Sequence, residues 1–223
     1  MSISAVFHTI FTGANTGFML RGLGMTVMIA VLSAALSMIA GTFFALLRTY
    51  ADGKWKWVSH LVSIYTEFFR CTPNLLWILW IYFTVKGNKI VVSVFAIVLF
   101  TSAVMSEIFR GGLNSIPKGQ FEAAKSQGFG TVQMFVYLIL PQTYRKVIPA
   151  LLSQVITIIK DTSFLKMVDV AEFMRNCGVV LGSIYDIRGM MMLFLFEAVC
   201  YFAICFTLSC TVRAYQKGQA RLS

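Results

Sequence analysis

The segment KGQFEAAKSQGFGTVQMFVYLILPQ, from Lys118 to Gln142, interrupts a chain that is otherwise rich in long apolar runs. It carries a glutamate, two lysines and three glycines, and it predicts a short helix over residues 120–127. Just before it, Ser115 is expected to cap the helix start, and Pro117 fits a first turn, where a missing N–H group costs little. Gly128 suits the left-handed residue that ends a helix.

The second half of the segment predicts another helix after a sharp turn. Gly130 and Thr131 offer a restart, and the apolar residues that follow recur at helical spacing. These residues are Val132, Phe135, Val136 and Ile139. Pro141 is expected to block further regular hydrogen bonding, because proline has no backbone N–H group.

The composition indicates an integral membrane protein. Of the 223 residues, 58% are hydrophobic and 13% are charged, whereas soluble domains carry roughly 45–50% apolar and about 25% charged residues. The net charge of +10 fits the basic cytoplasmic loops of a membrane protein better than it fits nucleic-acid binding. The first basic residue is Arg21, so no basic region precedes the first apolar run, and a cleaved signal peptide is not expected.

A spanning helix needs about 20 apolar residues. Five tracts are candidates: about Leu23–Leu47, Trp57–Val85, Ile90–Phe109, Val147–Val168 and Met190–Val212. The second tract is too long for one straight span and is broken by EFFRCTPN, and KDTS interrupts the fourth. We therefore predict an all-α integral membrane fold with five transmembrane helices, preceded by an extracellular or interfacial segment over residues 1–21.

The basic residues predict the orientation. Eleven Lys and Arg residues follow the first span, separate the third from the fourth, or follow the last, and six lie on the opposite side. The richer side is expected to be cytoplasmic. The N-terminus is then outside, the C-terminal tail over residues 215–223 is inside, and the segment 118–142 is cytoplasmic.

A short helix presented on the cytoplasmic side suits docking into the groove of a partner. Phe121 and Phe129 offer apolar anchors, Glu122 offers a charge, and the small residues Ala123 and Ala124 allow a close approach. The alternative, which the residues alone leave open, is an ordinary helix lying at the membrane interface.

EAAKSQGFGTVQMFVYLILP resembles the EAA loop of ATP-binding-cassette (ABC) importer permeases: Glu122, Ala123, Ala124 and Gly128 match it, followed by LILP. Three further stretches resemble the polar amino-acid subfamily: YTEFFRCTPNLLWIL, SEIFRGGLNSIPKGQ and IIKDTSFLKMV. The resemblance covers residues 22–214, nearly the whole chain. The chain departs at Cys71, where the subfamily commonly has glycine.

This resemblance implies a permease domain over residues 22–214 of the type I importer fold, with its coupling loop at about 117–141. It implies a bacterial inner-membrane protein that pairs with a second permease, identical or related, with two cytoplasmic ATPases and with an extracellular or periplasmic amino-acid-binding protein. The coupling helix, with Phe121, Glu122, Ala123, Ala124 and Gly128, would sit in a cleft of the ATPase. The sequence has no G-x-x-x-x-G-K-[ST] motif, so ATP and Mg²⁺ are expected on the partner.

Acidic residues at membrane depth are candidates for function, because burying a charge there is costly. Four such acids occur in the spans: Glu67, Glu107, Asp161 and Glu197. Each of the first two has an arginine three residues later, Arg70 and Arg110, and pairs at this spacing can neutralise each other. We expect a structural pair at Glu107, and for Glu67 the structural and functional readings stay open.

Glu67 and Asp161 lie where a helix is expected to break, and broken helices expose backbone groups that suit an ionic substrate. Thr72 is expected to cap a new helix with Pro73 at its first position. We predict that Glu67 and Asp161 bind the cationic group of an amino acid. Its carboxylate would be bound by Arg70 or by the N–H groups after Thr72, and Thr162 and Ser163 would add hydrogen bonds.

Other functions receive less support. An ion-coupled secondary transporter remains the main alternative, with the membrane acids as a proton relay. The sequence offers no nucleophile–base pair for an enzyme, and the five cysteines form no CxxC or Cys/His metal pattern. The motifs fit a homodimer and a heterodimer equally, and they do not select one amino acid.

Overall fold

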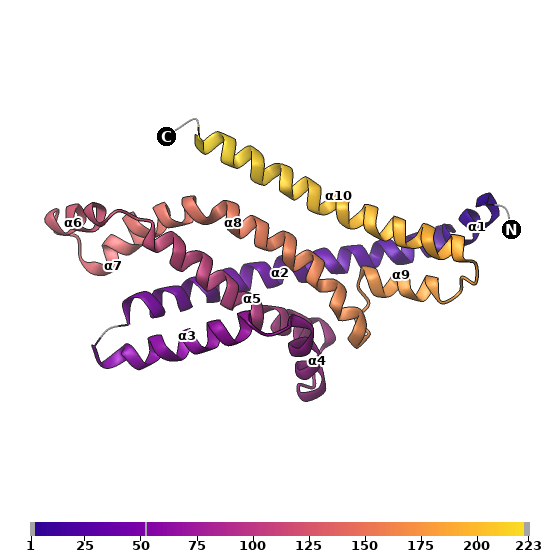
Figure 1. Cartoon of the computed structure of the whole chain (residues 1–223), viewed down its shortest axis with the longest axis horizontal. Helices are drawn as coiled ribbons and strands as arrows, with labels where there is room; N and C mark the ends of the chain where they lie inside the picture. The colour runs from indigo at the N-terminus through magenta and orange to yellow at the C-terminus, as the bar shows by residue number, and fades with distance from the viewer. Residues whose placement is uncertain (1–2, 52, 221–223) are drawn as a thin grey trace. The chain divides into compact units, whose positions relative to one another are not determined.

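The computed structural model describes residues 3–51 and 53–220, and every regular element in these ranges is helical (Figure 1). In chain order they are α1 (Ile3–Ile10), α2 (Gly13–Tyr50), η1 (Gly53–Trp55), α3 (Lys56–Arg70), α4 (Asn74–Thr84), α5 (Lys89–Asn114), α6 (Lys118–Ser126), α7 (Thr131–Met134), η2 (Phe135–Ile139), α8 (Leu140–Asp161), η3 (Thr162–Val168), α9 (Phe173–Leu181) and α10 (Ile187–Ala220).

Among the described residues, four helical stretches are long and apolar enough to cross a membrane. They are Gly13–Tyr50, Lys89–Asn114, Thr131–Val168 and Ile187–Gly218. Four of the five predicted spans lie within these stretches. The remaining one is divided into α3 and the short apolar helix α4, so the count of five stays a prediction.

The predicted break in the second tract is present, at residues 71–73. Helix α3 ends at Arg70 and α4 begins at Asn74, so Pro73 precedes the helix instead of occupying its first position. The Thr72 hydroxyl donates a hydrogen bond to the Phe68 carbonyl, 2.8 Å away, in the last turn of α3. The cause is local, because proline restricts the residue before it to extended conformations and cannot donate to a preceding turn.

The helix that follows α7 continues through Pro141, contrary to the prediction that this residue blocks it. Residues Phe135–Ile139 form one π-helical stretch, and α8 begins directly after it at Leu140. In a regular α-helix the Pro141 ring would clash with the Tyr137 carbonyl, and the wider π turn relieves that clash.

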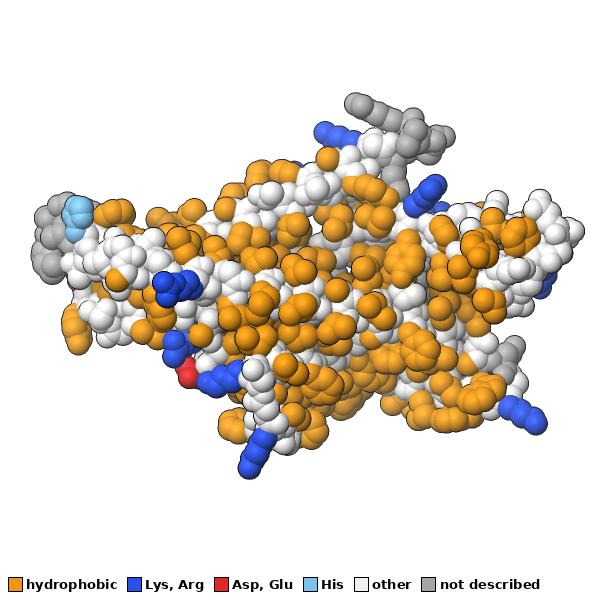
Figure 2. Space-filling view, turned by 180° about the vertical axis from the view of Figure 1, so that it is seen from behind, with side chains coloured by type: hydrophobic (Ala, Val, Ile, Leu, Met, Phe, Trp, Pro, Cys, Tyr) orange, Lys and Arg blue, Asp and Glu red, His pale blue; other side chains and the backbone are white. Residues whose placement is uncertain are grey.

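The chain divides into two compact units. Unit 1 comprises Met1–Ala34, Asn74–Ile97 and Val155–Thr211, and unit 2 comprises Ala35–Pro73, Val98–Gln154 and Val212–Ser223. Hydrophobic side chains cover much of the face seen in Figure 2, and exposed phenylalanines such as Phe83 (85%) and Phe202 (64%) occur in both α4 and α10. Such surfaces suit contact with lipid.

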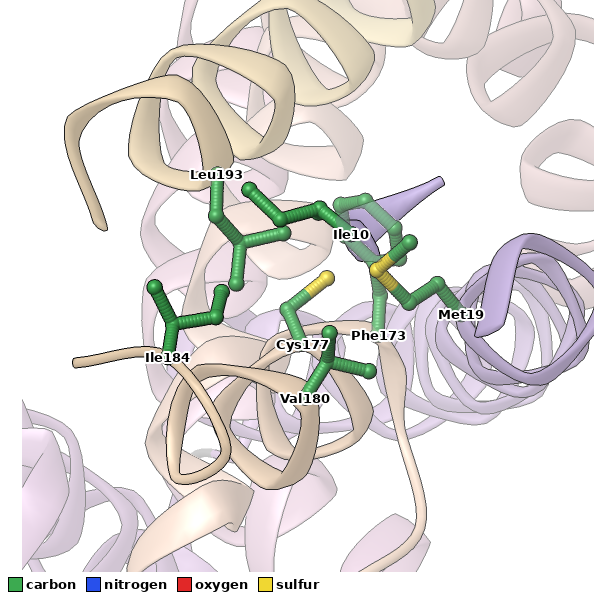
Figure 3. Packing of buried hydrophobic residues seen from close by; sticks show 7 residues of the cluster. All are labelled: Ile10, Met19, Phe173, Cys177, Val180, Ile184 and Leu193. Atoms are coloured by element: carbon green, nitrogen blue, oxygen red, sulfur yellow. The ribbon is translucent and has the colours of Figure 1, made fainter. Parts of the chain in front are cut away.

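Unit 1 contains an apolar cluster in which α9 packs against α1, α2 and α10 (Figure 3). The buried members are Ile10, Met19, Phe173, Cys177, Val180, Ile184 and Leu193. Helix α9 was not predicted from the sequence. It approaches α2 closely because Gly22 has no side chain: a Cβ there would lie 2.8 Å from the Asn176 Nδ2 atom and from the Glu172 carbonyl oxygen.

Unit 2 also depends on glycine contacts between helices. A Cβ at Gly41 of α2 would lie 2.5 Å from the Met105 Cβ of α5, and one at Gly112 of α5 would lie 2.2 Å from a methyl group of Val147 in α8. Small residues at helix interfaces allow the close approach that membrane helices use in place of a hydrophobic driving force. The close contacts at Gly41 and Gly112 therefore hold α5 against α2 and α8 within this unit.

Candidate functional site

Helix α6 is present, as predicted, but its first residue differs from the prediction. It starts at Lys118, two residues earlier than expected, with Pro117 directly before it. Ser115, predicted to cap this helix, instead donates its hydroxyl to the Gly112 carbonyl, 2.7 Å away, at the end of α5. Ser115 lies three residues before α6, so it serves the preceding helix.

The side chains of α6 divide between two faces. Glu122 and Ala123 are exposed, whereas Ala124 is only 2% exposed. Phe121 is half-buried, and the centre of its ring lies 6.3 Å from that of Phe135. Phe121 and Ala124 therefore pack against the chain itself, and Glu122 and Ala123 are presented outwards.

Gly128 ends α6 in the predicted left-handed conformation, with φ of +80°. The Gly128 N–H donates to the Lys125 carbonyl at 3.0 Å, and the Phe129 N–H donates to the Ala124 carbonyl at 3.1 Å. This pair of bonds is the Schellman motif, which satisfies the last carbonyl groups of a helix. Among the described residues, apart from the two chain neighbours of Gly128, no atom lies within 4 Å of a Cβ placed there, so the backbone angle, and not lack of space, requires glycine.

Two polar contacts brace this segment against α5 and α8. The Gln142 side-chain amide donates to the Gln120 side-chain oxygen at 3.2 Å, and the Lys146 ammonium donates to the Ser115 carbonyl at 2.8 Å. Both bonds connect residues on either side of the Gly128 turn. They join the start of α8 to the first turn of α6 and to Ser115, the residue after α5, so the beginning of α6 is attached to α8.

A cluster of five charged residues occupies unit 2, around Glu107. Arg110 donates to both Glu107 oxygens, with a shortest distance of 2.8 Å, which confirms the predicted contact. Arg48 also contacts Glu107 directly, and it lies 3.7 Å from Glu67. Arg70 lies 3.6 Å from Glu67.

Arg48 was absent from the predicted site, although it connects the two acids. Its side chain and that of Glu107 are each 17% exposed, whereas Glu67 is 57% exposed and Arg70 is 39% exposed. Glu107 is therefore the half-buried centre of the cluster, with an arginine on each side. Glu67 is more accessible and keeps oxygen surface that a ligand can reach.

The other predicted substrate residues lie in unit 1. Asp161 ends α8, and its carboxylate accepts a hydrogen bond at 3.1 Å from Asn74, the first residue of α4. Two interrupted helices therefore meet at this pair. Thr162 is fully buried and donates to the Ile159 carbonyl at 2.7 Å, while Ser163 is half-buried. Glu67 and Arg70 belong to unit 2, so the five predicted substrate residues do not form one cluster within either unit.

A pocket of about 300 Å³ lies in unit 1 between the α8–η3 segment, α9 and α10. Its polar lining comprises Lys160, Ser163, Glu197 and Tyr201. It thus combines an ammonium, a carboxylate and two hydroxyl groups. Ser163 and Glu197 were selected from the sequence as separate candidates. The packing of α10 brings them into one pocket with Lys160 and Tyr201.

Glu172, which the sequence analysis did not select, is fully buried at the start of α9. Its carboxylate accepts hydrogen bonds from the backbone N–H groups of Met174 (2.9 Å) and Arg175 (2.6 Å), and from the Thr26 hydroxyl (3.3 Å). The Tyr201 hydroxyl is a weaker donor at 3.5 Å. Burial raises the pKa of Glu172 to about 7, and these hydrogen bonds limit the rise.

Asp169, in the loop before α9, forms a surface ion cluster. It adopts φ of 55°, accepts from Arg175 at 2.8 Å and pairs with Lys89 at 3.2 Å. The hydrogen bond from Arg175, followed by that from Lys89, lowers the pKa of Asp169. Glu172 accepts hydrogen bonds from the first N–H groups of α9 in the interior, and Asp169 binds Arg175 of α9 at the surface.

Residues 50–221 match the family described as the binding-protein-dependent transport system inner membrane component. The match extends over more than half of the chain, so the chain belongs to this family. It is a membrane component of a transport system, as the EAA-type segment predicted.

Two curated relatives from Bacillus subtilis (strain 168) resemble nearly the whole chain. A probable glutamine ABC transporter permease protein, GlnP, is 33% identical over 94% of this chain and 97% of its own length. The arginine transport system permease protein ArtQ is 29% identical over 82% of this chain and 90% of its own.

Two solved structures share the fold. The crystal structure of an amino acid ABC transporter with histidines has a TM-score of 0.78 at 26% identity, covering 91% of this chain and 94% of that one. An inward-facing structure of the MetNI methionine ABC transporter has a TM-score of 0.75 at 19% identity, covering 92% and 99%. The predicted permease fold is thereby confirmed.

Proposed function

We propose that this chain is the permease subunit of an ATP-driven importer of a polar amino acid. The observation that carries the proposal is α6: an EAA-type helix with an exposed face, ended by Gly128 and joined to α8 near its start, in a chain of a transport family. The names of its relatives, a glutamine permease and an arginine permease, support an amino-acid substrate.

In this proposal α6 couples the permease to a cytoplasmic ATPase. The exposed Glu122 and Ala123 contact the ATPase cleft, while Phe121 and Ala124 anchor the helix to its own unit. Gly128 sets the angle between α6 and the returning helix. When ATP binding closes the ATPase pair, the docked helices move with it, and the contacts of Gln142 and Lys146 transmit that movement to α8 and α5.

The substrate is bound at membrane depth. Asp161 is the acceptor for the substrate ammonium group, with Thr162 and Ser163 beside it, and Asn74 orients its carboxylate. Glu67 is a second acceptor for a cationic group, and Arg70 is the partner for a carboxylate. Because Arg48 and Arg70 both lie near Glu67, substrate binding there competes with existing ion pairs.

The assembly follows from the same proposal. A second permease, identical or related, completes the pathway, two ATPases bind ATP and Mg²⁺, and an extracellular binding protein delivers the substrate. The N-terminus lies outside and the C-terminus lies in the cytoplasm, as the distribution of Lys and Arg indicates. The chain itself performs no covalent chemistry.

Reconstitution into proteoliposomes tests this function against ion-coupled secondary transport. The chain is reconstituted alone, with an ion gradient, and then with the partner ATPase, a second permease and internal ATP. Uptake that requires the ATPase and ATP supports the importer. Uptake by the chain alone, driven by the gradient, contradicts it.

A further inference from the structure

An apolar groove lies where α2 is joined to α3 through η1, within unit 2. Its volume is about 460 Å³. The lining includes Phe43, Leu46, Tyr50, Ala51, Trp55 and Val58. We call it the hairpin groove. None of the residues assigned above to coupling or substrate binding lines it.

Exposed lysines accompany this groove. Lys54 and Lys56 flank Trp55 in the chain, and both are exposed. Between residues 49 and 66 the sequence contains one acid, Asp52, against these two lysines. The groove therefore combines an apolar interior with a net positive edge.

Two exposed tryptophans lie in this part of the chain. Trp55, which lines the groove, is 65% exposed, and Trp57, two residues later, is 58% exposed. The sequence Lys-Trp-Lys-Trp therefore alternates ammonium groups and indole rings at the connection between the apolar helix α2 and helix α3. Tryptophan is enriched where membrane meets water, and cytoplasmic lysines next to a membrane helix attract anionic lipids.

We propose that the hairpin groove binds an anionic phospholipid, with an acyl chain along Phe43, Leu46 and Val58 and the phosphate group beside Trp55, where one of the two exposed lysines that flank it can pair with the charge. The apolar lining and the lysines together favour a ligand that has both an acyl chain and a negative charge. A free phosphate ion would leave the apolar lining unused, and a zwitterionic lipid would gain little from the two lysines.

The groove shares a wall with the packing of α6. The Tyr50 ring lines the groove and lies 4.4 Å, centre to centre, from the Phe135 ring, which in turn packs against Phe121 of α6. A bound lipid would hold Tyr50 in place next to this aromatic contact. Any effect of the bound lipid on coupling through α6 rests on the proposed function. Lipid binding to the groove does not depend on that function.

Brominated lipids, which quench tryptophan fluorescence on contact, measure this binding in the full chain without an ATPase. Trp77→Phe and Trp80→Phe leave Trp55 and Trp57 as the reporters. The purified chain is titrated in mixed micelles with brominated phosphatidylglycerol, and separately with brominated phosphatidylcholine. We expect half-maximal quenching at roughly tenfold less phosphatidylglycerol, since each lysine near an anionic headgroup adds several-fold to affinity.

Two variants separate the charges from the groove. Lys54→Gln with Lys56→Gln should remove the preference for phosphatidylglycerol, whereas the matched control Lys86→Gln, an exposed lysine elsewhere, should keep it. Ala51→Phe fills the groove and leaves the lysines in place, and it should weaken quenching by both lipids. All four changed positions are exposed or half-buried, so folding is not at risk.

Three results would overturn the proposal. One is equal quenching by the two lipids, and another is an unchanged preference after both lysines are replaced. The third is loss of quenching when the chain is assembled with its second permease or ATPase, because a protein surface would then occupy the groove. Failure of ATP-driven uptake, by contrast, would contradict the importer and leave the lipid measurement standing.

Discussion

The guanidinium group of Arg48, in α2, contacts the carboxylate of Glu107, in α5, although 59 positions separate the two residues in the sequence. Both side chains are 17% exposed. Glu107 also accepts hydrogen bonds from Arg110, so this half-buried acid is shared between a neighbour in its own helix and a residue of another helix. Removing Arg48 would leave the Glu107 carboxylate with one of these two arginine partners.

We expect Arg48→Gln to lower the free energy of unfolding by about 1–3 kcal/mol, because the half-buried Glu107 carboxylate loses a charged hydrogen-bond partner while Arg110 retains its own contact. Arg70→Gln is the control: Arg70 is 39% exposed and lies 3.6 Å from Glu67, and exposed pairs contribute at most about 1 kcal/mol. Thermal unfolding of the purified chain in detergent measures both. Equal losses in the two variants would contradict a special role for Arg48.

The contact between Gly22 and α9 predicts a second effect on stability. We expect Gly22→Ala to destabilise unit 1 by about 1–3 kcal/mol, because the added Cβ would lie 2.8 Å from the Glu172 carbonyl oxygen. Gly24→Ala, two residues away in the same helix, adds a Cβ with nothing within 4 Å. It should be neutral or stabilising by up to about 1 kcal/mol, since alanine favours helices over glycine.

Unfolding temperatures of the two glycine variants in the same detergent compare them directly. The opposite order, with Gly24→Ala the less stable variant, would show that α9 does not pack against Gly22 in the purified chain.

Local features of this fold were predictable, whereas contacts between distant segments were not. The left-handed Gly128 and the break before α4 follow from the chemistry of glycine and proline, which acts within a few residues. The Glu172 carboxylate, by contrast, meets Thr26 across 146 positions. Ser115 was assigned to the wrong helix because its hydroxyl had two helix ends within reach.

The buried Glu172 predicts a dependence of stability on pH. Its pKa is raised from 4.5 to about 7, so between these values the native chain holds a proton that the unfolded chain has lost. The stabilising contribution is complete below about pH 4.5 and is lost as the pH rises through 7. Its full size is about 3 kcal/mol, from about 1.4 kcal/mol per pKa unit.

We therefore expect a higher unfolding temperature at pH 5.5 than at pH 8 in the unmodified chain, and a smaller difference in Glu172→Gln, which cannot ionise. Glu122→Gln, an exposed glutamate, is the matched control and should keep the original difference. If Glu172→Gln kept the full difference, another group would be responsible for it.

Asp161 provides a test of the substrate site. We expect Asp161→Asn to raise the KM for uptake by about tenfold or more, because a charged partner of the substrate ammonium is lost while the side chain keeps its shape and an oxygen for Asn74. Basal ATP hydrolysis by the assembled transporter should stay within about twofold. Unchanged KM for uptake would remove Asp161 from the site, and loss of assembly would assign it a structural role.

The turn at Gly128 provides a test of coupling. With φ of +80°, any residue with a β-branched side chain is strained there. We expect Gly128→Val to reorient α6, so that the assembled transporter still hydrolyses ATP but imports less than about a tenth as much substrate per ATP.

Gly130→Ala is the matched control, because Gly130 has φ of −65° and a Cβ there would meet only Gln133, at 3.6 Å. Simultaneous measurement of uptake and phosphate release in proteoliposomes gives the ratio. A normal ratio in Gly128→Val, with the complex intact, would show that the angle of α6 does not govern coupling.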